Sequence, residues 1–135
     1  MRAFREAVEA GDLDAVEALL AEDVVFTSPV VFKPYPGKAI TAAILRAVSQ
    51  VFEDFRYERE IGGTDGRDHA LVFAARVGDR ELTGCDFIHV DDNGLIDELT
   101  VMVRPLSGAQ ALAAAMGARF EEIVKEAEAR SASAS

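Results

Sequence analysis

Apolar residues in the first half of the chain recur every three or four positions, which is the spacing of amphipathic helices. The apolar face of a first predicted helix comprises Phe4, Ala7 and Val8. Gly11 is placed to end this helix and Asp12 to cap the next one. The apolar face of that second helix comprises Leu13, Val16, Leu19 and Leu20. A longer helix is predicted from about Lys38 to Phe52, with further apolar positions at Ile40, Ile44, Val48 and Val51.

Strand-like segments lie on both sides of this long helix. Before it, Val24-Val25-Phe26-Thr27 is a β-branched and aromatic run, and the proline-bracketed segment 33–37 then forms a loop. After it, apolar and charged residues largely alternate from Phe55 to Ile61, as in a strand with one solvated face. Three more strands are predicted over residues 69–77, 80–91 and 95–104.

Two short turns set the register of these three strands. Gly78-Asp79 is predicted to join the first two, and Asn93-Gly94 to join the last two as a type I′ turn. If both turns contain two residues, the predicted partners are Val77 with Arg80, Leu71 with Asp86, Asp86 with Val101, and Asp92 with Leu95.

The last helix follows Pro105, where Ser107 and Gln110 form a capping-box pattern and Leu106 stands at the staple position. Its apolar face comprises Leu112, Met116, Phe120 and Ile123. Helices first, then an antiparallel meander, then a helix predict an α+β fold. We expect a single domain over residues 1–130 and a frayed tail over residues 131–135.

The predicted register places a single carboxylate, Asp86, on an otherwise apolar sheet face. The apolar members of this face are Leu71, Phe73, Ala75, Leu82, Gly84, Ile88, Leu99, Val101 and Val103. A buried carboxyl group protonates or finds hydrogen-bond donors. Asp86 is therefore either a pocket acid with a raised pKa, or a structural carboxylate satisfied by a buried donor or exposed by a one-residue slip in register.

The opposite face is half apolar and half polar, which favours contact with a second subunit. His89 lies opposite Glu98 on this face, either as a catalytic pair or, as we favour, as a surface or interface salt bridge. Cys85 shares the face and has no cationic neighbour in the pattern, so we interpret it as a structural thiol.

Composition excludes several classes of function. The chain has 135 residues, half of them hydrophobic, and a formal net charge of −10. This charge argues against nucleic-acid and anionic-membrane partners. A single cysteine suits a reducing compartment, and no signal peptide or membrane-length apolar run is present, so we expect a cytoplasmic protein. Neither metal-ligand spacing nor a phosphate-binding glycine motif occurs, so no cofactor is expected.

Several segments, taken in their order and spacing from about Phe4 to Met116, resemble the NTF2-like superfamily and most closely its SnoaL-like branch. They are the helix junction 10–15, the run Leu20 to Val24, Ser28-Pro29-Val30 with the loop 34–37, and the hairpin segments Gly84 to Phe87 and Asn93 to Ile96. The resemblance implies a cone-shaped, cystatin-like fold in which a curved sheet wraps around a long helix. It also implies an internal apolar pocket and, often, a homodimer across the outer sheet face.

The resemblance also implies candidate site residues. The expected pocket lining comprises Phe4, Ser28, Tyr35, Leu71, Phe73, Leu99 and Val101, with Asp86 as its acid. Asp86 matches the protonated, hydrogen-bonding aspartate of ketosteroid isomerases. Their general-base aspartate falls on Ser28 and their oxyanion-hole tyrosine on Phe4, so two of the three groups are absent. The charged residues of limonene-epoxide-hydrolase-like members fall on apolar positions in 70–73 and near Val101. Polyketide cyclases need little more than an acid–base aspartate, a role open to Asp86 or to the position of Val101.

Three hypotheses follow, and whether the chain is an enzyme stays open among them. The first is a dimeric pocket protein that binds a small lipophilic molecule with Asp86 as its polar anchor. The second is an isomerase or polyketide cyclase with Asp86 as general acid–base. The third is a structural or interaction domain whose cone is filled by its own side chains.

Overall fold

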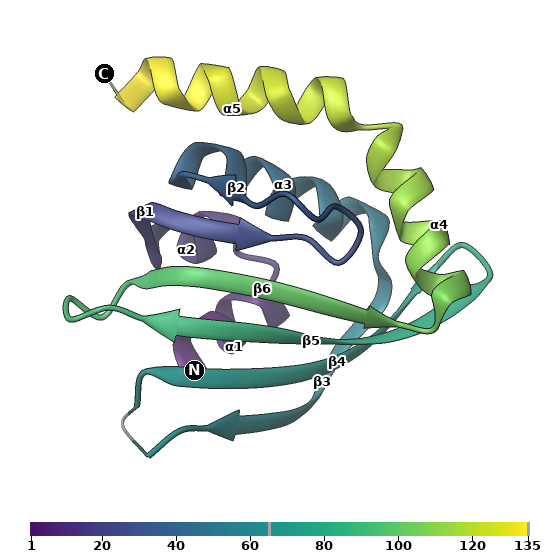
Figure 1. Ribbon diagram of the computed structural model, residues 1–135, viewed down its shortest axis with the longest axis horizontal. Helices are drawn as coiled ribbons and strands as arrows, with labels where there is room; N and C mark the ends of the chain where they lie inside the picture. The colour runs from purple at the N-terminus through teal and green to yellow at the C-terminus, as the bar shows by residue number, and fades with distance from the viewer. Residues whose placement is uncertain (65, 135) are drawn as a thin grey trace.

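The structure is a computed structural model that describes residues 1–64 and 66–134. In it a curved, open sheet is covered on its concave side by helices (Figure 1), as the α+β prediction requires. The helices are α1 (Arg2–Glu9), α2 (Leu13–Ala18), α3 (Lys38–Val51), α4 (Leu106–Gly117) and α5 (Phe120–Ala134). The strands are β1 (Leu20–Thr27), β2 (Tyr35–Pro36), β3 (Glu53–Gly62), β4 (Asp68–Val77), β5 (Arg80–Val90) and β6 (Ile96–Arg104).

The strand order is β2-β1-β6-β5-β4-β3, so the meander β3 to β6 forms most of the sheet. Neighbouring strands are antiparallel except β1 and β6, which are parallel. The predicted register is confirmed across the centre of the sheet, where Val77 pairs with Arg80, Leu71 with Asp86 and Asp86 with Val101. The predicted apolar face is therefore the concave, helix-covered face.

The Asn93-Gly94 turn was predicted wrongly. Gly94 has a positive φ of 79° but Asn93 does not, so the turn is not type I′. The Gly94 N–H instead donates to the carbonyl of Asp91, and the Asp91 N–H donates to Leu95. A bulge in β6 at Asp97 accommodates the longer turn, because His89 still pairs with Glu98 whereas Val90 pairs with Ile96. Asp92 does not pair with Leu95, yet the register at Asp86 is unaffected.

The ends of three helices also differ from the prediction. Asp12 caps α2 as expected, but Leu20 lies in β1 because it pairs with Ile96 of the sheet. Helix α4 begins at Leu106 with Pro105 at its N-cap, so Ser107 lies inside the helix and does not cap it. The predicted last helix is two helices, α4 and α5, with a break after Gly117. Helix α5 continues through Ala134, into the segment expected to be frayed, and Ser135 lies outside the described residues.

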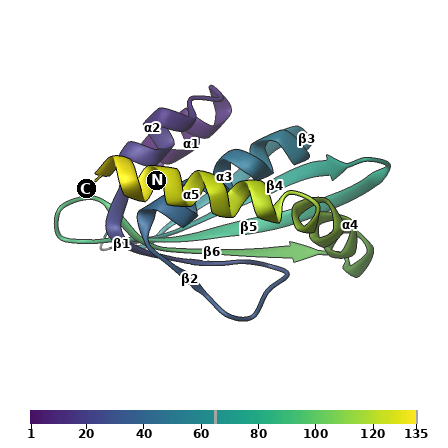
Figure 2. The same ribbon diagram turned by 90° about the horizontal axis from the view of Figure 1, so that it is seen from above.

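Helix α3 lies in the concavity of the sheet, and α5 lies alongside α3 on its far side (Figures 1 and 2). Tightly buried side chains from β1, β4 and β6 meet those of α1, α2 and α3 in one core. Its most buried members include Val16, Leu20, Val24, Ala43, Leu71, Phe73, Ile96 and Leu99.

The convex face of the sheet carries exposed apolar side chains between polar ones. Phe87 of β5 is 42% exposed and Met102 of β6 is 59% exposed. Homodimerisation through this face stays a prediction. No helix in the described part of the chain combines the length and the apolarity needed to cross a membrane.

Gly84 lets the aromatic side chain of Phe73 lie across β5. The two residues are cross-strand partners, and a Cβ atom at Gly84 would lie 2.4 Å from Cζ of Phe73 and 2.7 Å from the Met102 carbonyl oxygen. Gly84→Ala is expected to lower the free energy of unfolding by about 1–3 kcal/mol, since overpacking a fixed ring and backbone shifts both. Urea denaturation measures this. Gly117→Ala is the matched control, because its Cβ meets nothing within 4 Å. Equal stability of the two variants would contradict this description of the packing.

Candidate functional site

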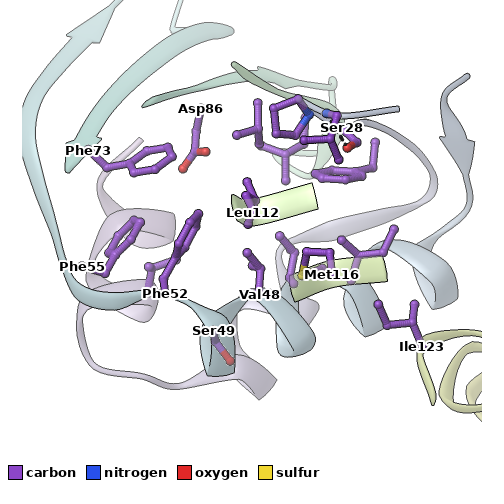
Figure 3. Close-up of a pocket in the computed structure, with 18 of the residues that line it drawn as sticks. Ser28, Val48, Ser49, Phe52, Phe55, Phe73, Asp86, Leu112, Met116 and Ile123 are labelled. Carbon is purple, nitrogen blue, oxygen red and sulfur yellow. Dashed lines mark hydrogen bonds between the residues drawn. The ribbon is translucent and has the colours of Figure 1, made fainter. Parts of the chain in front are cut away.

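A cavity of about 390 Å³ lies between the concave face of the sheet and the helices (Figure 3). Each of the described helices and strands contributes at least one residue to its wall, and the loop after β1 lies at one side. The residues that line it are mainly aliphatic and aromatic, and they include Phe4, Val16, Phe26, Tyr35, Ile44, Val48, Phe52, Phe55, Phe73, Leu99, Val101, Leu112, Met116 and Ile123. The volume falls within the range of small-molecule sites, so the cone is not filled by its own side chains.

Four aromatic rings gather at one end of this cavity. Phe55 stacks on Phe52 and on Phe73, with ring centroids 5.7 and 5.0 Å apart. Tyr57 meets Phe55 edge-on at 5.0 Å and Phe73 edge-on at 6.5 Å. Such contacts fix the orientation of each ring. The Tyr57 hydroxyl is thereby directed across the sheet toward β5.

Asp86 is the carboxylate of this cavity, and its side chain points into it beside Phe73 (Figure 3). Its residue exposure is only 8%. The Tyr57 hydroxyl donates a hydrogen bond of 2.8 Å to Oδ2 of Asp86. Burial raises the pKa of Asp86 to about 7, because a charge is poorly solvated there, and the hydrogen bond from Tyr57 opposes this shift. The group therefore exchanges its proton near neutral pH.

Tyr57 stays a hydrogen-bond donor under these conditions. Burial, followed by the negative charge of Asp86, raises the pKa of the Tyr57 phenol far above its usual value of 10.0. The Arg5 guanidinium lies 5.9 Å from the centroid of the Tyr57 ring and acts in the opposite direction. The sequence pattern placed Tyr57 beside Phe55 on an alternating strand but did not reveal its partnership with Asp86. In the structure, the feature that identifies Tyr57 is an inward-facing hydroxyl group next to the buried carboxyl group of Asp86.

The other predicted lining residues mostly reach the cavity. Phe4, Ser28, Tyr35, Phe73, Leu99 and Val101 all line it. Leu71 does not, because it is fully buried in the core behind the wall. Ser28 lies near the loop side of the cavity, and its hydroxyl oxygen accepts a hydrogen bond from the Val30 N–H at 3.1 Å (Figure 3). The described contacts of Ser28 include no base that could activate its hydroxyl group.

His89 lies outside the cavity. Its Nδ1 atom is 2.6 Å from Oδ1 of Asp97, so its ion-pair partner is the bulged residue of β6 and not Glu98, its cross-strand neighbour. The bond to Asp97 raises the pKa of His89. Cys85 is half-buried on the same convex face, and burial raises the pKa of its thiol. A raised thiol pKa disfavours a nucleophilic role.

The cavity wall contains few ionisable side chains. Of the described residues that line it, Asp86 is the one carboxylate, and none is a lysine, arginine or histidine. Ser28, Ser49, Tyr35 and Tyr57 supply the hydroxyl groups. The arrangement can therefore bind an uncharged apolar molecule and direct one hydrogen bond at it, or exchange one proton with it.

Comparisons with known proteins agree with this architecture. A family model described as SnoaL-like domain matches residues 1–99. The chain is similar to the structure of a steroid delta-isomerase from Pseudomonas aeruginosa, with 45% identity over 90% of this chain and 89% of that chain and a TM-score of 0.85. It is also similar to a protein with a cystatin-like fold from Silicibacter pomeroyi DSS-3, with 39% identity over 94% and 91% of the two chains and a TM-score of 0.85.

A more distant neighbour shows the fold alone. It is a candidate polyketide cyclase from Pseudomonas putida KT2440, with 22% identity over 79% of this chain and 90% of that chain and a TM-score of 0.63. No curated protein matches the chain.

Asp86→Asn is expected to stabilise the protein at pH 8 but not at pH 4. The ordinary pKa of 3.8 rises to about 7 in the fold. The folded state therefore binds the proton more tightly, and wild-type stability falls as pH rises from about 4 to 7. This shift corresponds to roughly 4 kcal/mol at pH 8, as an upper value.

Urea denaturation of wild type and Asp86→Asn across this pH range measures the difference in stability. Asp79→Asn, 96% exposed, is the control. A constant difference between wild type and Asp86→Asn would contradict a buried, proton-exchanging carboxyl group.

Proposed function

This chain belongs to the SnoaL-like domain family of the NTF2-like superfamily, and we propose that its cavity binds a small lipophilic molecule with Asp86 as the polar anchor. The observation that carries the proposal is a single buried carboxyl group in an apolar cavity of about 390 Å³. Burial of a carboxyl group with a single hydrogen-bond donor, here Tyr57, is unfavourable. A ligand that forms a hydrogen bond with this carboxyl group would account for its presence in the cavity, whereas packing alone does not.

The charge of the cavity limits the chemistry of the ligand. An anionic molecule such as a fatty acid would meet the Asp86 carboxyl group with no lysine, arginine or histidine among the described lining residues to balance it. A neutral molecule avoids that repulsion. Protonated Asp86 can donate a hydrogen bond to a carbonyl oxygen, and ionised Asp86 can accept one from a hydroxyl group. Tyr57 bonds to Oδ2, so Oδ1 is the oxygen we assign to the ligand.

Binding of the neutral fluorophore N-phenyl-1-naphthylamine tests the cavity. Its fluorescence should rise on mixing with wild type at micromolar concentrations, because the dye leaves water for an apolar site. Ala113→Trp fills the cavity from α4 and should abolish the signal, provided that circular dichroism shows an unchanged fold. A lipophilic ketone should displace the dye about threefold to tenfold better than the matching hydrocarbon, and Asp86→Leu should remove that preference. Dye binding by Ala113→Trp equal to wild type would contradict the site.

A second candidate function is isomerisation by proton transfer next to a carbonyl group. Two features favour it: the 45% identity to a steroid delta-isomerase, and the burial of Asp86, which raises its pKa to about 7 and suits it to acid–base work at neutral pH. In this reaction the Asp86 carboxylate removes a proton from one carbon and returns it to another. The double bond moves and no atoms are gained or lost. The resemblance to ketosteroid isomerases places Ser28 at the position of their base and Phe4 at that of their tyrosine, so their mechanism is not available here. Isomerisation by this chain would use Asp86 as the proton carrier.

A Δ5-3-ketosteroid is the substrate that tests this second function. Conversion to the conjugated enone should be seen as a rise in ultraviolet absorbance, and the rate should increase with pH through about 7, because the ionised Asp86 is the base. Asp86→Asn should lower the rate by about 10²–10⁴-fold, while Asp79→Asn should leave it unchanged. Conversion by Asp86→Asn at the wild-type rate would show that another group transfers the proton.

A further inference from the structure

Helix α5 is attached to the rest of the molecule through the buried Ile123, the partly buried Ala127 and a group of ion pairs. It lies alongside α3 (Figure 2), and its principal helix contact is with α3. Among its described side chains, Ile123 is the one that is fully buried, at 3% exposure. Helix α4, in contrast, contacts α3 and the strands β4, β5 and β6. A Cβ atom added to Gly108 of α4 would lie 2.8 Å from Cβ of Leu82, so α4 packs closely on the sheet.

An ion-pair cluster joins α5 to α2 and α3. The Arg130 guanidinium of α5 bonds to Glu17 of α2 at 2.5 Å and to Glu126 of α5 at 3.1 Å. Arg46 of α3 bonds to the same Glu17 at 3.2 Å and lies 3.9 Å from Glu126. The side chains of Arg46 and Arg130 are about one-quarter exposed. Their Nε–H groups are shielded from solvent without a hydrogen-bond partner among the described residues, so the cluster is not fully satisfied.

A second, polar cavity of about 400 Å³ lies under the same helix. It is lined by Leu13, Arg46, Ala47, Ser49, Gln50, Arg119, Glu122, Ile123 and Glu126, which belong to α2, α3, α5 and the residue before α5. Beside the packing of Ile123, the boundary between α5 and α3 therefore includes a polar gap. These ion pairs are partly buried and each contributes modestly, so α5 can separate from α3 by breaking this cluster and the packing of Ile123, without disturbing the contacts of α4 with the sheet.

The same helix closes part of the apolar cavity. Phe120 and Ile123 of α5 line that cavity, as do Met116 and Gly117 at the end of α4. Phe120 is 48% exposed, and Val31 of the loop after β1 is 41% exposed, so both stand at its rim. The helix breaks between Gly117 and Phe120. This break supplies a place for rotation of α5 relative to α4.

We propose that α5 is a lid, which admits ligand to the apolar cavity by moving away from α2 and α3 about the Gly117–Arg119 break and is held closed by the Arg46–Arg130 ion-pair cluster. The role in ligand entry rests on the proposed function of the cavity, whereas the opening itself does not.

Hydrogen exchange tests the opening without a ligand. Amides of α5 should exchange faster than those of α4 and β5 in wild type. Arg130→Met, which keeps the length of the side chain and removes its charge, should accelerate exchange in α5 by about twofold to fivefold and leave β5 unchanged. Arg56→Met is the matched control, because it removes an exposed ion pair with Glu58 on the edge strand β3. Exchange of α5 at the same rate as β5 in every variant would overturn the lid, since α5 would then open only with global unfolding.

Stopped-flow mixing with N-phenyl-1-naphthylamine tests entry. The dye is neutral, so salt does not change its electrostatic attraction to the protein. If the cluster holds the lid closed, the association rate should rise with sodium chloride from about 0.05 to 0.5 M in wild type and in Arg56→Met, because salt screens the ion pairs. Arg130→Met should bind about twofold to fivefold faster at low salt and respond less to added salt.

The outcomes separate the two proposals. Association rates that are equal in Arg130→Met and wild type at all salt concentrations would overturn the lid while leaving the cavity as a binding site. Absence of dye binding in every protein, together with fast exchange of α5, would overturn the proposed function and the role in ligand entry, and would leave only the opening of the helix.

Discussion

The chemistry of the cavity depends on keeping one carboxyl group away from water. Asp86 stands at the centre of the sheet, between Leu71 on β4 and Val101 on β6, and faces the cavity. Its ionised form is disfavoured there, and a single phenol hydroxyl from Tyr57 supplies the compensating hydrogen bond. The balance between these two effects leaves the proton of Asp86 available near pH 7. A fully apolar cavity would lack this chemistry, and a fully solvated carboxylate would be ionised throughout the neutral range.

The surrounding architecture holds Asp86 and its hydrogen-bond donor in this position. Gly84 allows Phe73 to lie across β5, and Phe73 packs with Phe55 and Tyr57 so that the phenol points at Asp86. The sheet and α4 form much of the cavity wall, and α5 completes the wall with Phe120 and Ile123 and is joined to α2 and α3 by ion pairs. The protein thus combines a tightly packed acid site with a less firmly held cover, which suits an internal cavity that must exchange its contents.

The sequence predicted the centre of the site because turn chemistry and alternation agree there. Gly78-Asp79 set the β4–β5 register, which put Asp86 on the apolar face as found. The prediction for the Asn93-Gly94 turn was wrong, but the bulge at Asp97 compensates for the longer turn. The β5–β6 pairing at Asp86 is therefore the predicted one. Alternation cannot detect a bulge of this kind, and the same bulge gave His89 an unexpected partner.

Tyr57 was missed for a related reason. The connection between the end of β3 at Gly62 and the start of β4 at Asp68 is not a two-residue turn that would set the register of these strands. In addition, two irregularities in β3 shift the pairing on either side of Arg56-Tyr57. The division of the last helix was missed because Leu112, Met116, Phe120 and Ile123 keep a helical spacing across the break. The depth of the cavity depends on packing between helices and sheet, which periodicity does not measure.

The pKa of Asp86 tests the central claim most directly. A ¹³C NMR titration of its side-chain carboxyl carbon, assigned by comparison with Asp86→Asn, would give the value in the folded protein. We predict a midpoint of about 7, raised by burial in the cavity. A midpoint at or below the ordinary 3.8 would show that Asp86 is solvated or fully paired, and would contradict its role as the proton-exchanging anchor of the cavity.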